Sequence, residues 1–213
     1  SFDDSSIISN LIDSYSNISN LGIIGPKQNS FYSPDKTVNE GWILFPNSKY
    51  IFNKYRLKNS IKPIESNFKI VDNVSGSFMI IKREVFEDVG EIDSALFLYA
   101  EDADFCIRAW KKKWISVVDK EVTILHKISA TSVAYSPLKI YYKTRNLIYF
   151  IKKHSDVQSS HGFFIRKYYL DFVIKSTKIL CSSDYSNNRI AKLRANILGL
   201  YHGAIIKRMN KYY

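Results

Sequence analysis

The spacing of apolar residues changes along the chain, and this change predicts two regions of different architecture. Between about residues 68 and 125, short β-branched runs alternate with short helical patterns, as is typical of an α/β body. After Pro137, apolar residues recur at helical spacing over long stretches. These stretches are 137–154, 161–180 and 187–208. The pattern therefore predicts an α/β region over 1–135 and a helical region over 136–213.

Within the first region, the pattern predicts one leading helix, a long loop and a set of short elements. A capped helix is expected from Asp4 to Tyr15, followed by a short strand that ends at Gly25-Pro26. Residues 27–66 are polar and aromatic without a clear period, and we expect them to form an irregular loop. The elements expected after this loop are strands at 69–71, 78–81, 114–118 and 122–125, an extended segment at 97–99, and helices at 83–89 and 101–113.

The composition is that of an ordinary globular protein. Hydrophobic residues make up 46% of the chain, and no uninterrupted apolar run reaches the roughly 18 residues of a membrane span. No leader peptide is visible in the sequence. The two cysteines, Cys106 and Cys181, lack the spacing of a metal site, so we expect free thiols and a cytoplasmic location.

The formal net charge of +11 has two alternative explanations, an anionic partner or a bias in the coding sequence. Lys and Arg become denser after Lys111 and alternate with Tyr, Phe and Ile, which suits a membrane leaflet, a nucleic acid or a phosphate-bearing substrate. An AT-rich coding sequence would raise the Lys content equally well. A nucleic-acid-binding module is thus one alternative, although no helix-turn-helix, RNA-recognition or zinc signature occurs in the sequence.

The densest group of chemically useful side chains lies at the start of the helix predicted at 101. Glu101, Asp102 and Asp104 would repel one another unless the helix N-terminus or a cation stabilises them. Asp104 and Arg108 are four positions apart and are predicted to pair, which leaves Asp102, with Glu101, to face a cleft. Such a carboxylate can accept a proton from a hydroxyl group. A charged first turn on an ordinary helix is the commoner explanation of this spacing, and a carboxylate-dependent metal hydrolase is a further alternative.

Two further features are candidates for ligand contact. His126 closes a β-branched run and could bind a divalent metal or contact a phosphate, although a lone histidine is more often a plain surface residue. Ser75, Gly76 and Ser77 lie between two predicted strands, where the backbone could approach a ligand or simply bend. Phosphate-binding loops, serine elbows and HExxH zinc helices have no match in the sequence.

Taken together, these segments resemble a known family. The segments that carry the resemblance are Val74–Phe86, Val89–Asp93 and Phe97–Arg108, followed by His126 and Ser132. Their order and spacing resemble the C-terminal half of family-2 glycosyltransferases, especially rhamnosyltransferase-like enzymes of bacterial surface-polysaccharide assembly. The likeness is dense from about 70 to 132 and extends loosely to Ile23–Pro26 and Tyr142–Asn146.

The resemblance implies a fold, a reaction and a set of partners. The implied fold is the C-terminal half of GT-A, the nucleotide-diphospho-sugar transferase fold with a mixed sheet, followed by a helical tail. The implied reaction is an inverting hexosyl transfer from a dTDP- or UDP-sugar to a glycan or lipid-linked acceptor. Mg²⁺ or Mn²⁺ is the implied cofactor of the full-length enzyme, and no nucleic acid is expected as a partner.

The same resemblance assigns roles to individual residues. Asp102 matches the general base that deprotonates the acceptor hydroxyl, and His126 matches a histidine that approaches the metal or the donor diphosphate. The remaining matches are Ser75, Gly76, Ser77 and Glu101 in the acceptor and donor-sugar pocket, and Asp104 and Arg108 as structural support.

The departures from the family pattern concern the donor side and two local positions. The DxD metal-binding motif of the family is expected upstream of the first helix, so we expect this chain to lack donor binding and turnover on its own. Glu91-Ile92 replaces a more usual Gly-Phe, and Lys113 stands where Gly is common. The basic, aromatic segment 162–175 is expected to contact the inner face of the plasma membrane peripherally, although packing on the catalytic body would explain it equally well.

Overall fold

The computed structural model describes residues 6–13, 18, 20–43, 67–127, 135–154 and 161–206, with the backbone alone for 161–168. Its contacts divide the chain into two compact units, and each is described here by itself. Unit 1 comprises Ser1–Asp93 and Glu101–Ile128, and unit 2 comprises Ser94–Ala100 and Ser129–Tyr213. The predicted helix cap at Asp4 lies outside the described residues.

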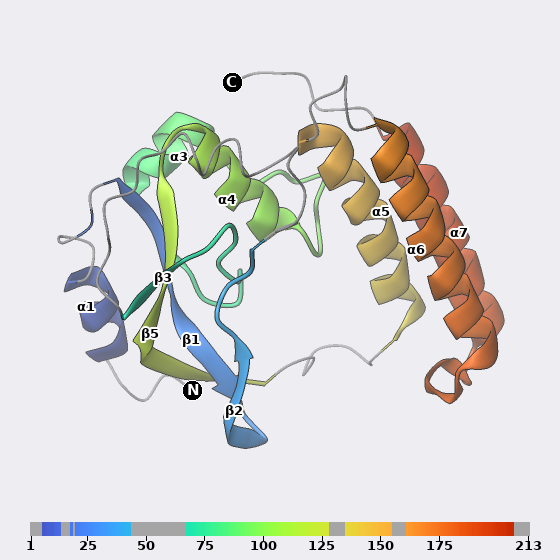
Figure 1. Cartoon of the computed structure of the whole chain (residues 1–213), viewed down its shortest axis with the longest axis horizontal. Coiled ribbons are helices and arrows are strands. Elements are labelled where there is room, and N and C mark those ends of the chain that lie inside the picture. Colours follow the sequence, from blue (N-terminus) through green and yellow to red (C-terminus); the bar gives the residue numbers. More distant parts are fainter. Residues whose placement is uncertain are drawn as a thin grey trace. The chain divides into compact units, whose positions relative to one another are not determined.

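Unit 1 is built on a mixed sheet around two long parallel strands (Figure 1). Its strands are β1 (Leu21–Ser30), β2 (Ser33–Asn39), β3 (Phe68–Ile70), β4 (Ile80–Ile81) and β5 (Ile115–His126). The order is β2-β1-β5-β3, and β4 pairs with β1. β1 and β5 are parallel, whereas β2, β3 and β4 each join them in antiparallel fashion. The α/β class expected from the sequence is therefore confirmed.

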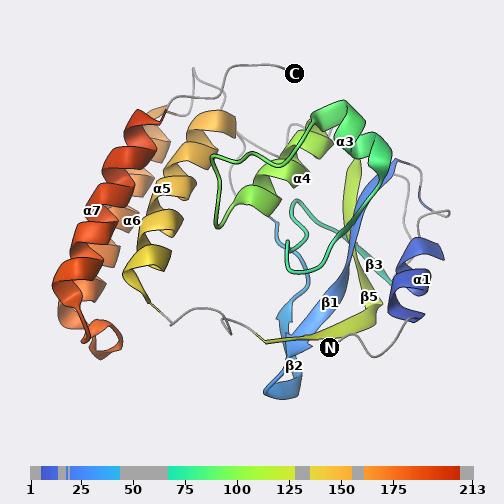
Figure 2. The same cartoon turned by 180° about the vertical axis from the view of Figure 1, so that it is seen from behind.

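Both faces of the central strands are buried by apolar residues. Adjacent residues of a strand point to opposite faces, and Ile23 and Ile24 accordingly belong to different core clusters. The helices α3 (Arg83–Val89) and α4 (Glu101–Lys111) contribute to the Ile23 cluster, and α1 (Ser6–Asp13) contributes to the other. Figures 1 and 2 show α1 and α4 on opposite sides of β1 and β5. Strands that are covered on both faces read as apolar runs, as these do.

Strand β1 is longer than the sequence predicts. It runs through Gly25-Pro26 to Ser30, and a hairpin to β2 occupies the start of the predicted 27–66 loop, so that prediction was wrong for 27–39. Pro26 is tolerated because the β1–β5 register shifts between Pro26 and Lys27, where a missing N–H does not break a regular ladder. The remainder of the predicted loop, 44–66, lies outside the described residues.

Strand β5 is one element, although two strands were predicted. The polar residues at 119–121 separate its two apolar runs and suggest a turn. Instead, the Asp119 carboxylate accepts hydrogen bonds from the backbone N–H groups of Glu121 (2.9 Å) and Val122 (3.4 Å). The same place carries the register shift opposite Pro26 and Lys27. A bulge held by a side chain therefore replaces the predicted turn.

Left-handed backbone conformations occur at the ends of helices α3 and α4. Gly90 (φ 73°) ends α3 as predicted, and Lys113 (φ 74°) follows the end of α4. A glycine adopts this conformation most easily, which explains why glycine is common at the position of Lys113 in the family that the sequence resembles. Tyr99 (φ 70°) and Ala100 (φ 71°) precede α4, so the extended segment predicted at 97–99 was wrong.

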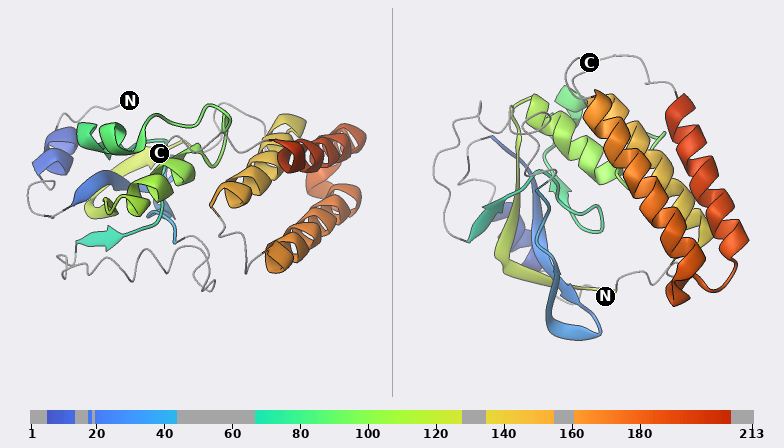
Figure 3. Two further views of the ribbon diagram at one scale, coloured as in Figure 1. Left: turned by 90° about the horizontal axis from the view of Figure 1, so that it is seen from above. Right: turned by 45° about the vertical axis from the view of Figure 1, so that its right-hand side comes forward.

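Unit 2 contains three helices that lie side by side (Figure 3). They are α5 (Pro137–His154), α6 (His161–Cys181) and α7 (Arg189–Ile205), with a 3₁₀ turn, η2 (Ser183–Tyr185), between the last two. The helices predicted at 137–154, 161–180 and 187–208 are confirmed. Within the described ranges, no helix combines the length and apolar character that crossing a membrane requires.

Close backbone packing and a polar network join these helices. A Cβ atom added at Gly203 would lie 2.7 Å from the Arg145 carbonyl oxygen, so this glycine allows α7 to approach α5 closely. The Thr144 hydroxyl donates to Asn196 Oδ1 (2.7 Å), and Asn196 Nδ2 donates to the Ser176 hydroxyl (3.1 Å). Lys175 Nζ donates to Thr144 Oγ1 (2.9 Å). All three helices therefore meet around hydrogen-bonding side chains.

Candidate active site

The Ser75–Ser77 segment is held against strand β1 by close packing and by a buried glutamine. A Cβ atom at Gly25 of β1 would lie 2.4 Å from Val74 Cγ1, so the absence of a side chain lets this segment approach the strand. Gln28, a buried residue of β1, donates from Nε2 to the Ser77 hydroxyl (2.8 Å). The Ser77 hydroxyl in turn shares a hydrogen bond with the Ser75 hydroxyl (2.8 Å). The sheet thereby fixes the position of the loop.

This loop meets the first turn of α4 at Asp102. The backbone N–H of Gly76 donates to Asp102 Oδ2 (3.0 Å), and the N–H of Ala103 donates to Asp102 Oδ1 (2.7 Å). A Cβ atom at Gly76 would lie 3.3 Å from Asp102 Cβ, which is a tight contact. The carboxylate is half-buried, and two backbone donors fix its orientation. Each oxygen keeps a further lone pair, so the group can still accept a proton.

Glu101 is next to this carboxylate and has a different environment. Burial raises the pKa of the Glu101 carboxyl, a backbone hydrogen bond opposes this, and the Asp102 charge raises it further. Among the described residues, its Oε2 atom is buried without a hydrogen-bond partner. Burial therefore makes the Glu101 carboxyl easier to protonate than an ordinary glutamate, whereas the Asp102 carboxylate is oriented by two backbone N–H groups.

Asp104 and Arg108 form the ion pair that their spacing predicts. Arg108 Nε lies 2.9 Å from Asp104 Oδ2, and the Asp104 side chain is fully buried. The guanidinium also donates to the carbonyl oxygens of Val89 and Glu91 (2.8 Å for Glu91), which lie where α3 ends. Asp104 therefore points into the protein and does not share a surface with Asp102. The structure thus gives no support to a metal hydrolase that uses all three carboxylates.

His126 lies at the end of β5, opposite Ser30 of β1 in the parallel register. Two residues earlier, Ile124 is opposite Gln28, whose side chain holds Ser77. Because residues two apart on a strand face the same side, His126 is on the sheet face to which Gln28 reaches. Among the described residues, no group of three or more His, Cys, Asp and Glu side chains could hold a metal ion. These residues alone do not form a metal site, so we derive no step through a metal.

Cys106 is excluded as a nucleophile by its surroundings. The thiol is fully buried in the core between α4 and the sheet, and burial raises its pKa to about 12. A thiol with so high a pKa carries almost no thiolate near neutral pH. Both cysteines are free, as the sequence predicts.

Sequence reasoning assigned no role to Gln28 or Asn146. The side chains of these two polar residues hold backbone segments that contain, or directly precede, predicted site residues. Gln28 fell in the region that was expected to be a loop. In unit 2, Asn146 of α5 donates from Nδ2 to the carbonyl oxygens of Leu98 (2.7 Å) and Tyr99 (2.9 Å). These residues come just before Glu101 in the chain. The available signal was the loose resemblance at Tyr142–Asn146, which marked Asn146 without indicating its contacts.

Comparisons with curated proteins relate the chain to glycosyltransferases, whereas no protein-family model matches it. One relative is the low-salt glycan biosynthesis hexosyltransferase Agl10 of Haloferax volcanii, 37% identical over 59 residues, or 28% of this chain and 19% of the relative. The dTDP-rhamnosyl transferase RfbF of Shigella flexneri is 28% identical over 110 residues, or 48% of this chain and 37% of the relative.

A third relative is the N-acetylglucosaminyl-diphospho-decaprenol L-rhamnosyltransferase of Mycobacterium tuberculosis. It is 35% identical over 63 residues, which are 30% of this chain and 20% of the relative. The chain thus spans between 19% and 37% of the length of these three relatives. All three are named as hexosyl- or rhamnosyltransferases, and they support a general function in glycosyl transfer.

Proposed function

We propose that this chain is the acceptor-side part of an inverting, family-2-type glycosyltransferase in which Asp102 is the general base. One observation carries the proposal. The Asp102 carboxylate is half-buried at the start of α4 and is oriented by backbone N–H groups, whereas Asp104 takes the nearby guanidinium of Arg108. An oriented carboxylate that a guanidinium does not neutralise is suited to accept a proton.

In the proposed reaction, the acceptor hydroxyl gives its proton to an Asp102 carboxylate oxygen while its own oxygen attacks the anomeric carbon of the donor sugar. The bond from that carbon to the diphosphate oxygen breaks, and its electron pair leaves with the nucleoside diphosphate. Attack from the side opposite to the leaving group inverts the anomeric configuration. The protein contributes the position of the acceptor and the base, which together account for much of the rate of such a transfer.

Glu101 and the Ser75–Ser77 loop complete the proposed acceptor and donor-sugar pocket. The loop is part of the proposal because the Gly76 N–H donates to Asp102, the proposed base, and Ser75 and Ser77 are the neighbours of Gly76 in the chain. Protonated Glu101 would leave one negative charge at the site and could donate a hydrogen bond to a sugar hydroxyl. Asp104 and Arg108 support this turn from inside the protein.

The names of the relatives suggest the partners. A dTDP-rhamnosyl transferase and a decaprenol-linked rhamnosyltransferase are among them. We therefore propose a dTDP- or UDP-sugar as donor, a glycan or lipid-linked acceptor of surface-polysaccharide synthesis, and a cytoplasmic location. Mg²⁺ or Mn²⁺ stays a prediction, and so does the contribution of His126, which rests on the resemblance alone because such ions prefer oxygen ligands.

The test is a comparison of Asp102→Asn with the unmodified enzyme in the native protein that contains this chain. Sugar transfer from dTDP-rhamnose or a UDP-sugar should fall by about 10²- to 10⁴-fold, the typical contribution of a general base. The amide can still accept the hydrogen bond from Gly76 but cannot take a proton. KM for the donor should change little, because the loss concerns proton transfer.

The matched control is Glu84→Gln, which removes an exposed carboxylate from α3 and should leave the rate unchanged. Retention of the full rate by Asp102→Asn, with the fold intact by circular dichroism, would show that Asp102 is not the base. The pH profile gives a second check, since the limb of the rate profile that reports deprotonation of the base should disappear in the variant.

A further inference from the structure

Helix α7 has an inverted distribution of polar and apolar residues. Its buried face carries Lys192, Ala195, Asn196 and the glycines that pack on α5. Its exposed face is apolar apart from one cation. The exposed residues, at spacings of three and four, are Ile190, Arg194, Ile197, Leu198, Tyr201, Ala204 and Ile205. Ile190 is 87% exposed and Tyr201 is 59% exposed. A helix in contact with water normally shows the opposite arrangement.

Helix α6 continues this apolar surface. From Tyr169 onward, where its side chains are described, the exposed positions include large apolar side chains at helical spacing, together with Asp171, Thr177 and the cation Lys178. The exposed apolar residues of α6 are Tyr169, Leu170, Val173, Ile174 and Leu180. α6 packs against α7, and Figure 3 shows the two helices side by side. We call the exposed apolar residues of α6 and α7, together with Arg194 and Lys178, the α6–α7 face.

The positive charge of the chain is concentrated in the same region. Residues 136–213 contain 15 Lys and Arg against 3 Asp, whereas residues 1–135 contain 16 Lys and Arg against 17 Asp and Glu. The net charges are therefore +12 and −1. No acidic residue follows Asp184 in the sequence, and six cationic residues do. A coding bias towards Lys would act on the whole chain, so it does not explain this asymmetry.

We propose that the α6–α7 face docks on an anionic lipid surface, with both helices lying in the plane of the interface. Such a surface offers apolar acyl chains to the exposed side chains and negative head groups to the surrounding cations, so it matches both properties at once. The proposal moves the membrane contact from segment 162–175, predicted from the sequence, to residues 169–205. It is independent of the chemistry proposed for Asp102.

Other occupants match only one of the two properties. A second copy of the chain would offer apolar area, but it would bring a helical region with the same charge of +12 against the first. A nucleic acid would satisfy the cations and leave most of the apolar side chains in water, because its surface is charged and polar. The lipid surface is therefore the occupant that the observations favour.

Flotation of the 213-residue chain with vesicles tests the proposal. Vesicles of phosphatidylcholine with phosphatidylglycerol should bind the chain at low salt, and pure phosphatidylcholine vesicles should bind it more weakly. The double variant Ile190→Ser/Tyr201→Ser should weaken binding on the order of tenfold for each residue, because each loses its apolar contact. Lys178→Gln and Arg194→Gln should each weaken binding to the anionic vesicles about fivefold. High salt should also weaken this binding, because it screens the attraction between the cations and the lipid head groups.

The matched control is Tyr32→Ser, which removes a similarly exposed aromatic residue from the β1–β2 turn of unit 1 and should leave vesicle binding unchanged. A second pair, Ile197→Ser/Leu198→Ser, repeats the test if the first pair misfolds. Failure of the unmodified chain to bind anionic vesicles, or equal binding by both double variants, would overturn the proposal. Two other results would also overturn the proposal. One is a dimer, seen by ultracentrifugation, that the double variants dissociate while no form of the chain binds vesicles. The other is binding to duplex DNA but not to vesicles.

Discussion

In unit 1, apolar side chains fill the space on both sides of β1 and β5, and most of the charged residues are at the surface. In unit 2, the interior between α5, α6 and α7 contains Thr144, Ser176, Asn196 and the amine of Lys175, while Ile190 and Tyr201 are exposed. The first arrangement is the ordinary one for a protein in water. The second combines a buried polar network with an apolar cluster around Ile140, Ile179 and Ala195, and it leaves other apolar side chains exposed.

Hydrogen bonds and close backbone contact add to the apolar cluster in holding the helices of unit 2 together. Asn196 links Thr144 and Ser176, and Gly199 and Gly203 allow α7 to approach α5. Small residues at the contact and polar side chains across it are also how helices associate in lipid, where the apolar driving force is weak. The comparison therefore predicts that the two units will respond in opposite ways to apolar and polar truncation.

The largest effect is expected in the core of unit 1. Phe105 is fully buried against α3 and the sheet, so Phe105→Ala should lower the free energy of unfolding by about 3–5 kcal/mol. Urea denaturation followed by circular dichroism measures this. Phe97→Ala is the matched control, since its ring is 73% exposed and its loss should change stability by less than about 0.5 kcal/mol.

A cost below about 1 kcal/mol for Phe105→Ala would break the comparison, because the apolar core would then not stabilise unit 1.

A smaller effect is expected for the polar network of unit 2. Asn196→Ala removes the partner of the Thr144 and Ser176 hydroxyls and should cost about 1–3 kcal/mol, because buried polar groups lose their hydrogen bonds. Ile190→Ala, on the exposed face of α7, should cost less than about 0.5 kcal/mol in the absence of lipid.

The double variant Thr144→Val/Asn196→Ala sharpens this result. If the network acts as one unit, the cost of the pair should be less than the sum of the single costs. Strict additivity, or a greater cost for Ile190→Ala than for Asn196→Ala, would contradict the inverted distribution.

The sequence predicts the helical elements of this protein well because their signals are local and long. The period at 137–154 extends over several turns, and the observed α5 has the same bounds. The Asp104–Arg108 pair is also local, since residues four apart on a helix are neighbours. Such features need no knowledge of the rest of the fold.

The strands and the candidate site depend on tertiary contacts, and there the sequence falls short. Pro26 and the polar residues at 119–121 suggest strand ends, but the bulge between β1 and β5 accommodates both, which only the pairing of two distant segments reveals. In the same way, Gly76 and Asp102 are 26 positions apart, and their hydrogen bond follows from the packing of a loop on a helix. The resemblance to a family identified both residues, but their contact required the fold.

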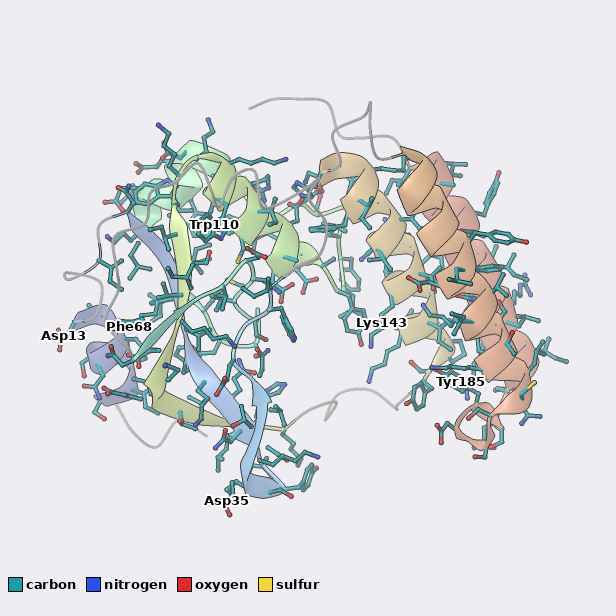
Figure 4. The ribbon with its side chains drawn as sticks, viewed as in Figure 1. Asp13, Asp35, Phe68, Trp110, Lys143 and Tyr185 are labelled. Carbon is teal, nitrogen blue, oxygen red and sulfur yellow. The ribbon has the colours of Figure 1, made fainter. Side chains whose placement is uncertain are left out.

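The smallest expected effect concerns Glu101 in unit 1. Its carboxyl group is partly buried, and one carboxyl oxygen has no hydrogen-bond partner among the described residues. Figure 4 shows the described side chains on the ribbon. Burial raises its pKa above the ordinary value of 4.5. The folded protein therefore favours the protonated form, and the stability from this group is fully present below about pH 4.5 and falls as the pH rises through the folded pKa. Glu101→Gln stays neutral and avoids this loss.

The variant should match the unmodified chain in stability near about pH 4 and exceed it slightly near about pH 7, by urea denaturation at both values. The gain should be small because Glu101 is only partly buried, and the remaining contact with water screens the charge. Glu84→Gln, at an exposed position on α3, should show no such difference between the two pH values. If Glu101→Gln is instead the less stable protein near neutral pH, the Glu101 carboxylate has a stabilising partner.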